Sequence, residues 1–216
     1  TRLYVLDLTD GHVRFLTYGQ DAEWSPDGRM VAFIRLGRDW QVGVIRGDGT
    51  GSASFVAVPG GIRSRLVWDP LGGCILFADG TRRICALQVQ EGVVTPMELP
   101  APCEELCWSP DGTWLAFTAP SPDDDSLGLY LYHRRDRRLT RIASVLPCRL
   151  FWTLKGRTLI ALGFDGYGAL RHDVANGTTR PLRVPEGLTP LAPSPAGDDM
   201  LYTADRAPGD LSIGET

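Results

Sequence analysis

Apolar and polar residues alternate along most of this 216-residue chain, in short runs separated by turn-forming residues. An alternation with a period of two is typical of β-strands that have one buried face. Most of the turns contain Asp-Gly, Glu-Gly or Asn-Gly, which supply the positive φ angle that a tight hairpin needs. The clearest such paired runs occupy residues 3–17, 41–58, 83–99, 129–143 and 169–184. No helical periodicity interrupts them, so the pattern predicts an all-β protein.

A second hairpin alternates with these runs and repeats almost letter for letter. "EWSPDGRMVAF" spans Glu23 to Phe33, and "CWSPDGTWLAF" spans Cys107 to Phe117. With the tryptophan as a marker, five units follow one another in steps of 44, 40, 44 and 41 residues. Their markers are Trp24, Trp68, Trp108, Trp152 and, in the last unit, Pro193. We expect Trp108 and Phe117 to be buried between repeats, because both recur with the period.

A period near 40 residues with four strands per unit is typical of β-propeller blades. We name the strands of a blade a to d, from the central channel outward, so that Ser-Pro-Asp-Gly forms the a–b turn. The chain begins with a c–d pair and ends with an a–b pair, which together would make a fifth blade and remove the open sheet edges. The sequence thus predicts one domain over 1–216, a closed five-bladed propeller; a part of a larger propeller is the alternative. The predicted blade units are 22–60, 65–100, 105–145, 149–185, and 190–204 completed by 3–17.

The "WSPDGxxLAF" hairpin and "LYVLDLTDGHVRFLT" (3–17) resemble the repeat of the TolB-type, WD40-like propellers. The same repeat occurs in the propeller domains of prolyl-oligopeptidase-like peptidases. The resemblance implies a propeller over nearly the whole chain, and a periplasmic or extracellular bacterial location. TolB-like propellers usually have six blades and an additional amino-terminal domain, whereas this sequence predicts five blades. The motif defines a fold and not an activity.

The composition argues against several partners. A net charge of −4 gives no basic footprint for nucleic acid. No apolar run approaches the roughly 18 residues needed to span a bilayer. The five cysteines have no zinc-site spacing, and an odd number cannot pair fully within one chain. We interpret them mainly as free thiols, with one disulfide as the alternative. The odd cysteine count is also compatible with a cytoplasmic location. We expect a monomeric domain.

The sequence offers little chemistry for catalysis. The three histidines, His12, His133 and His172, fall in c–d hairpins of different blades, where they cannot converge on a catalytic or metal site. No nucleophile elbow, phosphate loop or dinucleotide motif is present, so we expect no cofactor. The acidic stretch Asp123, Asp124 and Asp125 in a b–c loop could hold a hard cation, but matches no calcium-loop spacing. We interpret it as a solvated loop.

Charged residues recur three positions before the marker, at the predicted channel mouth. They are Asp21, Arg65, Glu105 and Arg149, with Pro190 in the last unit. The charges alternate in sign, which predicts a ring of salt bridges between blades or a site for a polar ligand. Neighbouring opposite charges lower carboxylate pKa values, which argues against the raised-pKa acid that glycoside hydrolysis requires.

The b–c and d–a loops should share one face of the propeller and vary most between repeats. They carry aromatic and arginine side chains of the kind that anchor partners: Arg38, Trp40, Tyr167 and Arg206. The sequence therefore predicts a non-enzymatic interaction module that binds a protein, peptide or carbohydrate at this face. The alternative is an enzyme-associated propeller, either the gating domain of a peptidase or a five-bladed glycoside hydrolase that uses Asp21 and Glu105.

Overall fold

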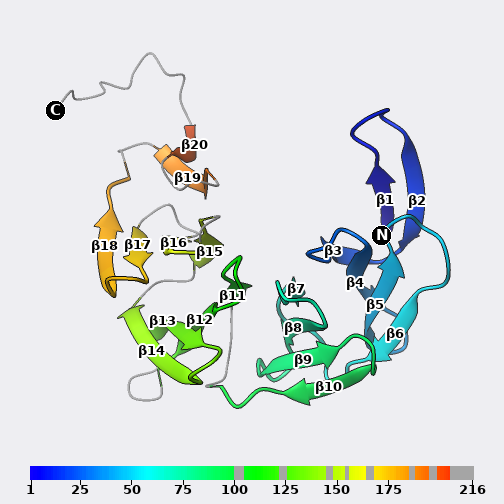
Figure 1. Ribbon diagram of the computed structural model, residues 1–216, viewed down its shortest axis with the longest axis horizontal. Helices are drawn as coiled ribbons and strands as arrows, with labels where there is room; N and C mark the ends of the chain where they lie inside the picture. Colours follow the sequence, from blue (N-terminus) through cyan, green and yellow to red (C-terminus); the bar gives the residue numbers. More distant parts are fainter. Residues whose placement is uncertain are drawn as a thin grey trace.

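The computed structural model describes residues 1–99, 105–121, 126–144, 148–153, 156–163, 168–184, 188–194 and 199–204. All the regular elements in these residues are β-strands, and four complete antiparallel blades follow one another around a centre (Figure 1). This confirms an all-β propeller with four-stranded blades. Among the described residues no helix is long and apolar enough to cross a membrane.

Each complete blade is a sheet whose four strands follow the order of the sequence. Blade 1 comprises β3 (Gln20–Trp24), β4 (Met30–Leu36), β5 (Trp40–Arg46) and β6 (Ser54–Ala57). Blade 2 comprises β7 (Val67–Trp68), β8 (Cys74–Ala78), β9 (Ile84–Gln88) and β10 (Val93–Pro96). Blade 3 comprises β11 (Glu105–Trp108), β12 (Trp114–Pro120), β13 (Leu127–His133) and β14 (Arg138–Ser144). Blade 4 comprises β15 (Cys148–Trp152), β16 (Thr158–Gly163), β17 (Ala169–Asp173) and β18 (Thr178–Leu182).

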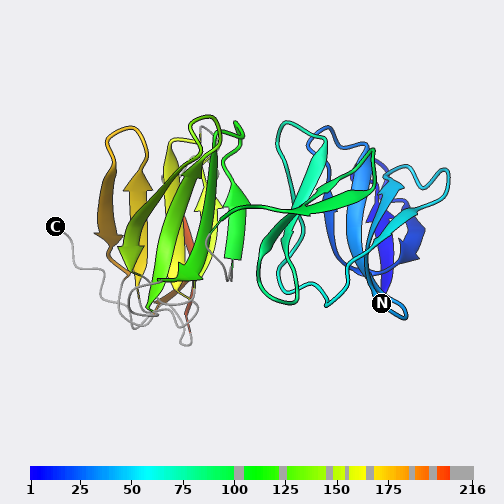
Figure 2. The ribbon, with the colours of Figure 1, turned by 90° about the horizontal axis from the view of Figure 1, so that it is seen from below.

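Two half-blades flank this series. β1 (Arg2–Leu6) pairs only with β2 (Val13–Tyr18), and β19 (Leu188–Pro193) pairs only with β20 (Met200–Ala204) among the described strands. Figure 1 shows the two pairs at opposite ends of an open arc, and Figure 2 shows the blades standing side by side. The expected joining of 3–17 with 190–204 is therefore not the arrangement of this structure. The two strand pairs are nevertheless consistent with the outer and inner pairs of one closing blade.

The Ser-Pro-Asp-Gly turns are held by the same hydrogen bonds in blades 1 and 3. The Ser25 hydroxyl donates to Asp27 Oδ1 (2.6 Å) and accepts the Met30 amide (2.9 Å). In blade 3 the Ser109 hydroxyl makes the equivalent bonds to Asp111 Oδ1 and the Trp114 amide at identical lengths. The turn glycines, Gly28 and Gly112, both have φ +68°, where a side chain would be strained. The turn is thus a local structure that its own residues determine.

The core consists of apolar layers between neighbouring sheets. Blades 1 and 2 bury one layer, blades 2 and 3 a second, and blades 3 and 4 a third. A smaller layer lies between β1–β2 and blade 1, and another between blade 4 and β20. Trp108 and Phe117 are buried, as expected from their recurrence. Their burial confirms that the inner hairpins are packed between blades.

Trp24 departs from this rule and is 47% exposed. The tryptophans of blades 2 and 4 reach back to the inner strand of the preceding blade, where Trp68 Nε1 donates to the Glu23 carbonyl (3.1 Å) and Trp152 Nε1 to the Cys107 carbonyl (3.3 Å). Before blade 1 stands the half-blade β1–β2, which contains no inner strand pair. Trp24 recurs with the same period as Trp108, but it is exposed because the neighbouring half-blade is incomplete.

Candidate functional site

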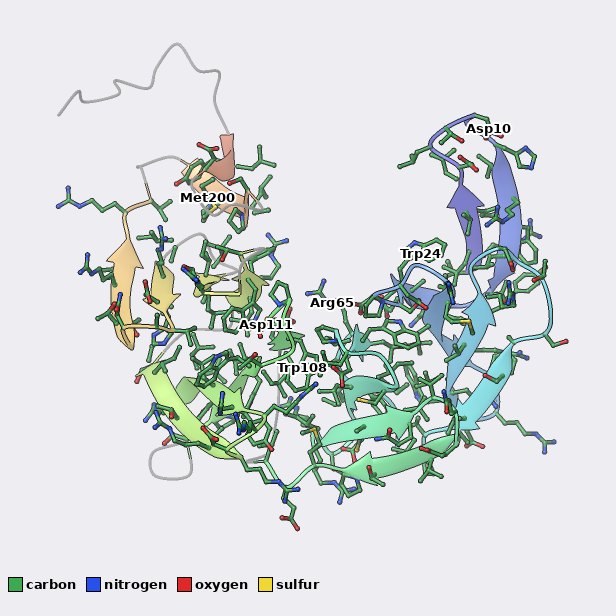
Figure 3. All side chains as sticks on the ribbon, viewed as in Figure 1. Asp10, Trp24, Arg65, Trp108, Asp111 and Met200 are labelled. Carbon is green, nitrogen blue, oxygen red and sulfur yellow. The ribbon has the colours of Figure 1, made fainter. Side chains whose placement is uncertain are left out.

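The inner strands of the four blades lie nearest the centre of the arc: β3, β7, β11 and β15 (Figures 1 and 2). All four begin on the same face of the propeller, which we call the channel end. At this end Arg65, just before β7, pairs with Glu105 at the start of β11; Nη2 lies 2.6 Å from Oε1. The Glu105 side chain is 16% exposed and that of Arg65 is 67% exposed. Figure 3 shows Arg65 on the inner side of the arc. The site therefore offers an arginine that is fixed at one side and open to solvent at the other.

Asp21 does not occupy the position that the spacing predicts. In blade 3, Trp108 pairs with Leu115 and Glu105 with Thr118, three residues further along β12. In blade 1, Trp24 pairs with Val31, and the residue opposite Ile34 is Gln20. A bulge between Gln20 and Glu23 inserts one residue, and Asp21 within it has φ +48°. The alternating ring of Asp21, Arg65, Glu105 and Arg149 is therefore incomplete in blade 1.

The carboxylate that lies near Arg65 from blade 1 is Glu23, which is not one of the charged residues three positions before the markers. Burial raises the pKa of Glu23 to about 7, although the positive charge of Arg65 and a hydrogen bond from the Trp68 backbone act to lower it. The argument that neighbouring opposite charges keep the channel carboxylates ionised thus fails for Glu23, because desolvation outweighs the Coulomb attraction. Glu23 stands where the other blades have Val67, Cys107 and Phe151, and this contrast was visible in the sequence.

Arg65 is influenced by both carboxylates. Burial lowers the pKa of the Arg65 guanidinium, but the hydrogen bond and charge of Glu105, together with the charge of Glu23, outweigh it and raise this pKa overall. The group is therefore a permanent cation between a paired carboxylate and a second carboxyl that titrates near neutral pH. Such a trio can bind a polar ligand, and its net charge changes with the protonation of Glu23.

The other predicted binding residues are more dispersed. Arg149 pairs with Leu162 in β16, and its guanidinium lies 6.0 Å from the centroid of the Phe151 ring. Trp40 begins β5 and packs against the buried layer of blades 1 and 2, so only part of its ring is accessible. Arg38 is exposed in the preceding loop. Tyr167, Arg206 and the possible cation ligands Asp123, Asp124 and Asp125 lie outside the described residues.

The histidines lie apart, as expected. His12 is exposed in the β1–β2 turn, and His133 pairs with Asp136 (2.8 Å) at the end of β13. His172 is buried in β17, where Nδ1 lies 2.8 Å from Thr179 Oγ1 and burial lowers its pKa. Within the described residues, no three histidine, cysteine, aspartate or glutamate side chains are placed to hold a metal ion.

Cys74, Cys85 and Cys107 form no disulfide with one another in the described part of the chain. Burial is the largest cause that raises the pKa of Cys74 to about 12 and that of Cys85 to about 11. Nearby carboxylates, Asp69 and Asp79, act in the same direction. Thiols with such pKa values remain protonated at neutral pH and are poor nucleophiles. Cys74 and Cys85 are therefore unsuited to act as nucleophiles.

Solved structures provide an independent comparison of the fold. TolB from Acinetobacter baumannii is 16% identical and superposes with a TM-score of 0.64, over 91% of this chain and 57% of the TolB chain. The chain shares its fold with the TolB propellers. A putative TolB from Agrobacterium tumefaciens is 15% identical, with a TM-score of 0.63 over 84% of this chain and 73% of that chain. The resemblance to TolB in the repeat motifs is thus confirmed at the level of fold.

The TolB-type fold is not confined to TolB. Hydrazine synthase from Kuenenia stuttgartiensis matches with 15% identity and a TM-score of 0.63, over 90% of this chain and 57% of that chain. The chain therefore spans little more than half the length of two of these three proteins. No protein-family model and no curated protein matches the sequence. At these identities the comparisons define the fold alone.

Proposed function

We propose that this TolB-type propeller is a non-enzymatic interaction module. Its binding face is the face of the propeller on which the inner strands begin. The observation that carries this proposal is the geometry of Arg65. Glu105 holds its guanidinium in place, while two thirds of the side chain stays accessible. A preorganised arginine with open donors suits a peptide, protein or carbohydrate that presents carboxylate or hydroxyl oxygens.

The two ends of the blades differ in a way that supports this choice of face. The a–b turns at the opposite end repeat the same bonds, as Ser25–Asp27 and Ser109–Asp111 show. At that end Arg134 also bridges blades 2 and 3 through Asp69 (2.7 Å) and lies 4.0 Å from the centroid of Trp108. Uniform turns locked by such contacts serve stability, whereas variable loops on a rigid support suit recognition.

The test selects ligands from a phage-displayed peptide library and a glycan array, and measures their affinity by calorimetry. Arg65→Ala and Arg149→Ala should weaken a genuine ligand at least tenfold, about 1.4 kcal/mol. Asp111→Ala, at the opposite end, should leave affinity unchanged. Trp40 is less suitable as a probe, because its packing makes truncation a stability change as well. Ligands that bind normally to both arginine variants would refute the assigned face.

Glu23 favours one alternative, a glycoside hydrolase that uses channel carboxylates. A carboxyl with a pKa near 7 has the protonation that a general acid needs, and Glu105 supplies a second carboxylate near the same arginine. Turnover of aryl glycosides that is abolished by both Glu23→Gln and Glu105→Gln would establish the enzymatic alternative. An absence of turnover across a panel of such substrates would leave the binding module as the better account.

We also propose that the two half-blades join, which would give the single, closed five-bladed domain over 1–216 that the repeat predicts. Its support is that β1–β2 matches the outer pair of a blade and β19–β20 the inner pair. A closed ring would make the binding face a rigid channel mouth.

A further inference from the structure

Two grooves mark the places where the half-blades lack strands. The first, about 150 Å³, lies between β1 and blade 1 and is lined by Leu3, Val5, Leu16, Trp24 and Val31 among others. The second, about 350 Å³, lies between blade 4 and β20. Its lining includes Ile160, Arg171, Leu182, Met200 and Tyr202. The first groove lacks an inner strand pair, and the second lacks an outer pair. Each end of the chain therefore carries what the other end is missing.

The outer face of the β1–β2 hairpin is apolar and open. Its large side chains are between 47% and 58% exposed: Tyr4, Leu6, Val13, Phe15 and Tyr18. The three aromatic rings form edge-on pairs with centroids 5.7 and 5.2 Å apart. In blade 4 the positions equivalent to Leu6 and Val13 are His172 and Thr179. His172 is buried, and the Thr179 hydroxyl donates to the Ile142 carbonyl of blade 3 (3.3 Å). The hairpin face is thus a blade interface without its partner.

The register of the complete blades predicts how the two half-blades fit together. In blade 4, Trp152 pairs with Leu159, which pairs in turn with His172. In the inner half-blade Pro193 and Met200 take the places of Trp152 and Leu159. In the outer half-blade Leu6 takes the place of His172, because Asp7 and Gly11 match Asp173 and Gly177 around the turn.

We propose that β20 pairs antiparallel with β1 of the same chain in one register. Met200 lies opposite Leu6, Leu201 opposite Val5, and Tyr202 opposite Tyr4. The proposal rests on the ring closure proposed above and specifies its contacts. It names the occupant of both grooves: β19–β20 fills the first, and β1–β2 covers the second.

The side chains agree with this register. Leu201 is 62% exposed at present, and the proposed pairing turns it toward Val5, Leu16 and Val31 in the first groove. Met200 and Tyr202 already line the second groove. Leu6 and Tyr4, which now border the first groove, would extend the face of Met200 and Tyr202 over blade 4 in the proposed pairing. A shift by one residue would reverse every one of these orientations. The apolar faces therefore agree with this register and exclude the registers shifted by one residue.

Two further contacts follow when the positions of the half-blades are matched to those of the complete blades. Trp68 and Trp152 donate to the carbonyl one residue before the marker of the preceding blade. The equivalent acceptor for Trp24 Nε1 is the Ala192 carbonyl. Arg171 and Arg180 lie directly opposite each other on the open side of blade 4, where like charges repel. The Tyr4 ring would approach Arg171 there, and an aromatic face stabilises such a cation.

Cysteine cross-linking tests the register directly. In the full chain with its five cysteines changed to alanine, Val5→Cys with Leu201→Cys places two thiols opposite each other, within the Cα separation that a disulfide accepts. We expect most of the monomer to form an intrachain disulfide on mild oxidation, seen by non-reducing electrophoresis and mass spectrometry. The matched control, Tyr4→Cys with Leu201→Cys, puts the thiols on opposite faces and should cross-link at least tenfold less.

The remaining outcomes of this experiment would overturn the proposal. Cross-links only between chains would show that a second copy fills the grooves. Equal cross-linking of both pairs would refute the register, and no cross-linking in a folded monomer would refute the closure. If the cysteine variants fail to fold, hydrogen exchange on the unaltered protein decides: the β1 amides that do not bond to β2 should exchange at least tenfold more slowly than those of the turn at residues 8–11. Rapid exchange would refute the closure, without bearing on the effect of Arg149→Ala on ligand binding.

Discussion

The hairpins Glu23–Phe33 and Cys107–Phe117 have nearly the same sequence but different surroundings. Their turns are superposable in hydrogen bonding, and Phe33 and Phe117 are both fully buried. Yet Trp24 is 47% exposed while Trp108 is 8% exposed. Figure 3 shows that Trp108 lies between complete blades, whereas Trp24 faces the open side of the arc. The comparison shows that the motif itself specifies the turn, while the adjacent blade determines how much of the tryptophan is buried.

The largest expected effect is on the two tryptophans. Trp108→Ala should lower the free energy of unfolding by about 3–5 kcal/mol, because it leaves a cavity between blades 2 and 3. With the half-blades apart, Trp24→Ala should cost only about 1–2 kcal/mol, because half of the Trp24 surface is then in water; in the closed ring proposed above it should cost about as much as Trp108→Ala. Urea unfolding of both variants measures the difference. The proposed ring closure predicts losses of similar size, and a much smaller loss for Trp24→Ala would contradict it.

The next prediction concerns Glu23, the residue before Trp24. The pKa of Glu23 is raised from 4.5 to about 7, so the folded state binds the proton more tightly than the unfolded state does. Stability should therefore fall as the pH rises from about 4.5 to 7, by about 1–2 kcal/mol after allowance for partial solvent screening. Glu23→Gln should flatten this part of the stability profile, and the exposed Glu91→Gln should not. A profile unchanged by Glu23→Gln would mean that Glu23 is solvated.

The turns should respond alike in the two repeats. Ser25→Ala and Ser109→Ala each remove one donor and one acceptor that hold the turn. Each should lower the free energy of unfolding by about 1 kcal/mol. Thermal unfolding against the exposed control Ser52→Ala measures both losses. A much larger loss for Ser109 would show that blade packing, and not only the local bonds, determines the stability of the turn.

The smallest effect concerns the ion pairs. A double-mutant cycle on Arg65 and Glu105 should give a coupling energy of about 0.5–1 kcal/mol, because Glu105 is largely shielded from solvent. The Arg29–Asp27 pair in the first hairpin, separated by 3.9 Å and exposed on both sides, should show no measurable coupling. Similar coupling in the two cycles would contradict the view that the channel end is the more preorganised.

The sequence by itself determined the strands, the four complete blades and the composition of both half-blades. Turn chemistry and two-residue alternation are local, so Ser109, Asp111 and Gly112 form the same turn wherever the motif occurs. The Arg65–Glu105 pair agrees with the expected salt bridges between blades, because each residue lies three positions before its marker tryptophan. These features depend on neighbours in the chain or on a register that the repeat preserves.

Only the tertiary structure decided which carboxylate approaches Arg65. A bulge at Asp21 moved the predicted partner out of register, and burial at Glu23 created a carboxyl that titrates near neutral pH. The bulge changes the path of the backbone without altering the hydrophobic pattern, and desolvation depends on atoms supplied by another blade. The exposure of Trp24 has the same origin, because it reflects a neighbour that its own repeat does not encode.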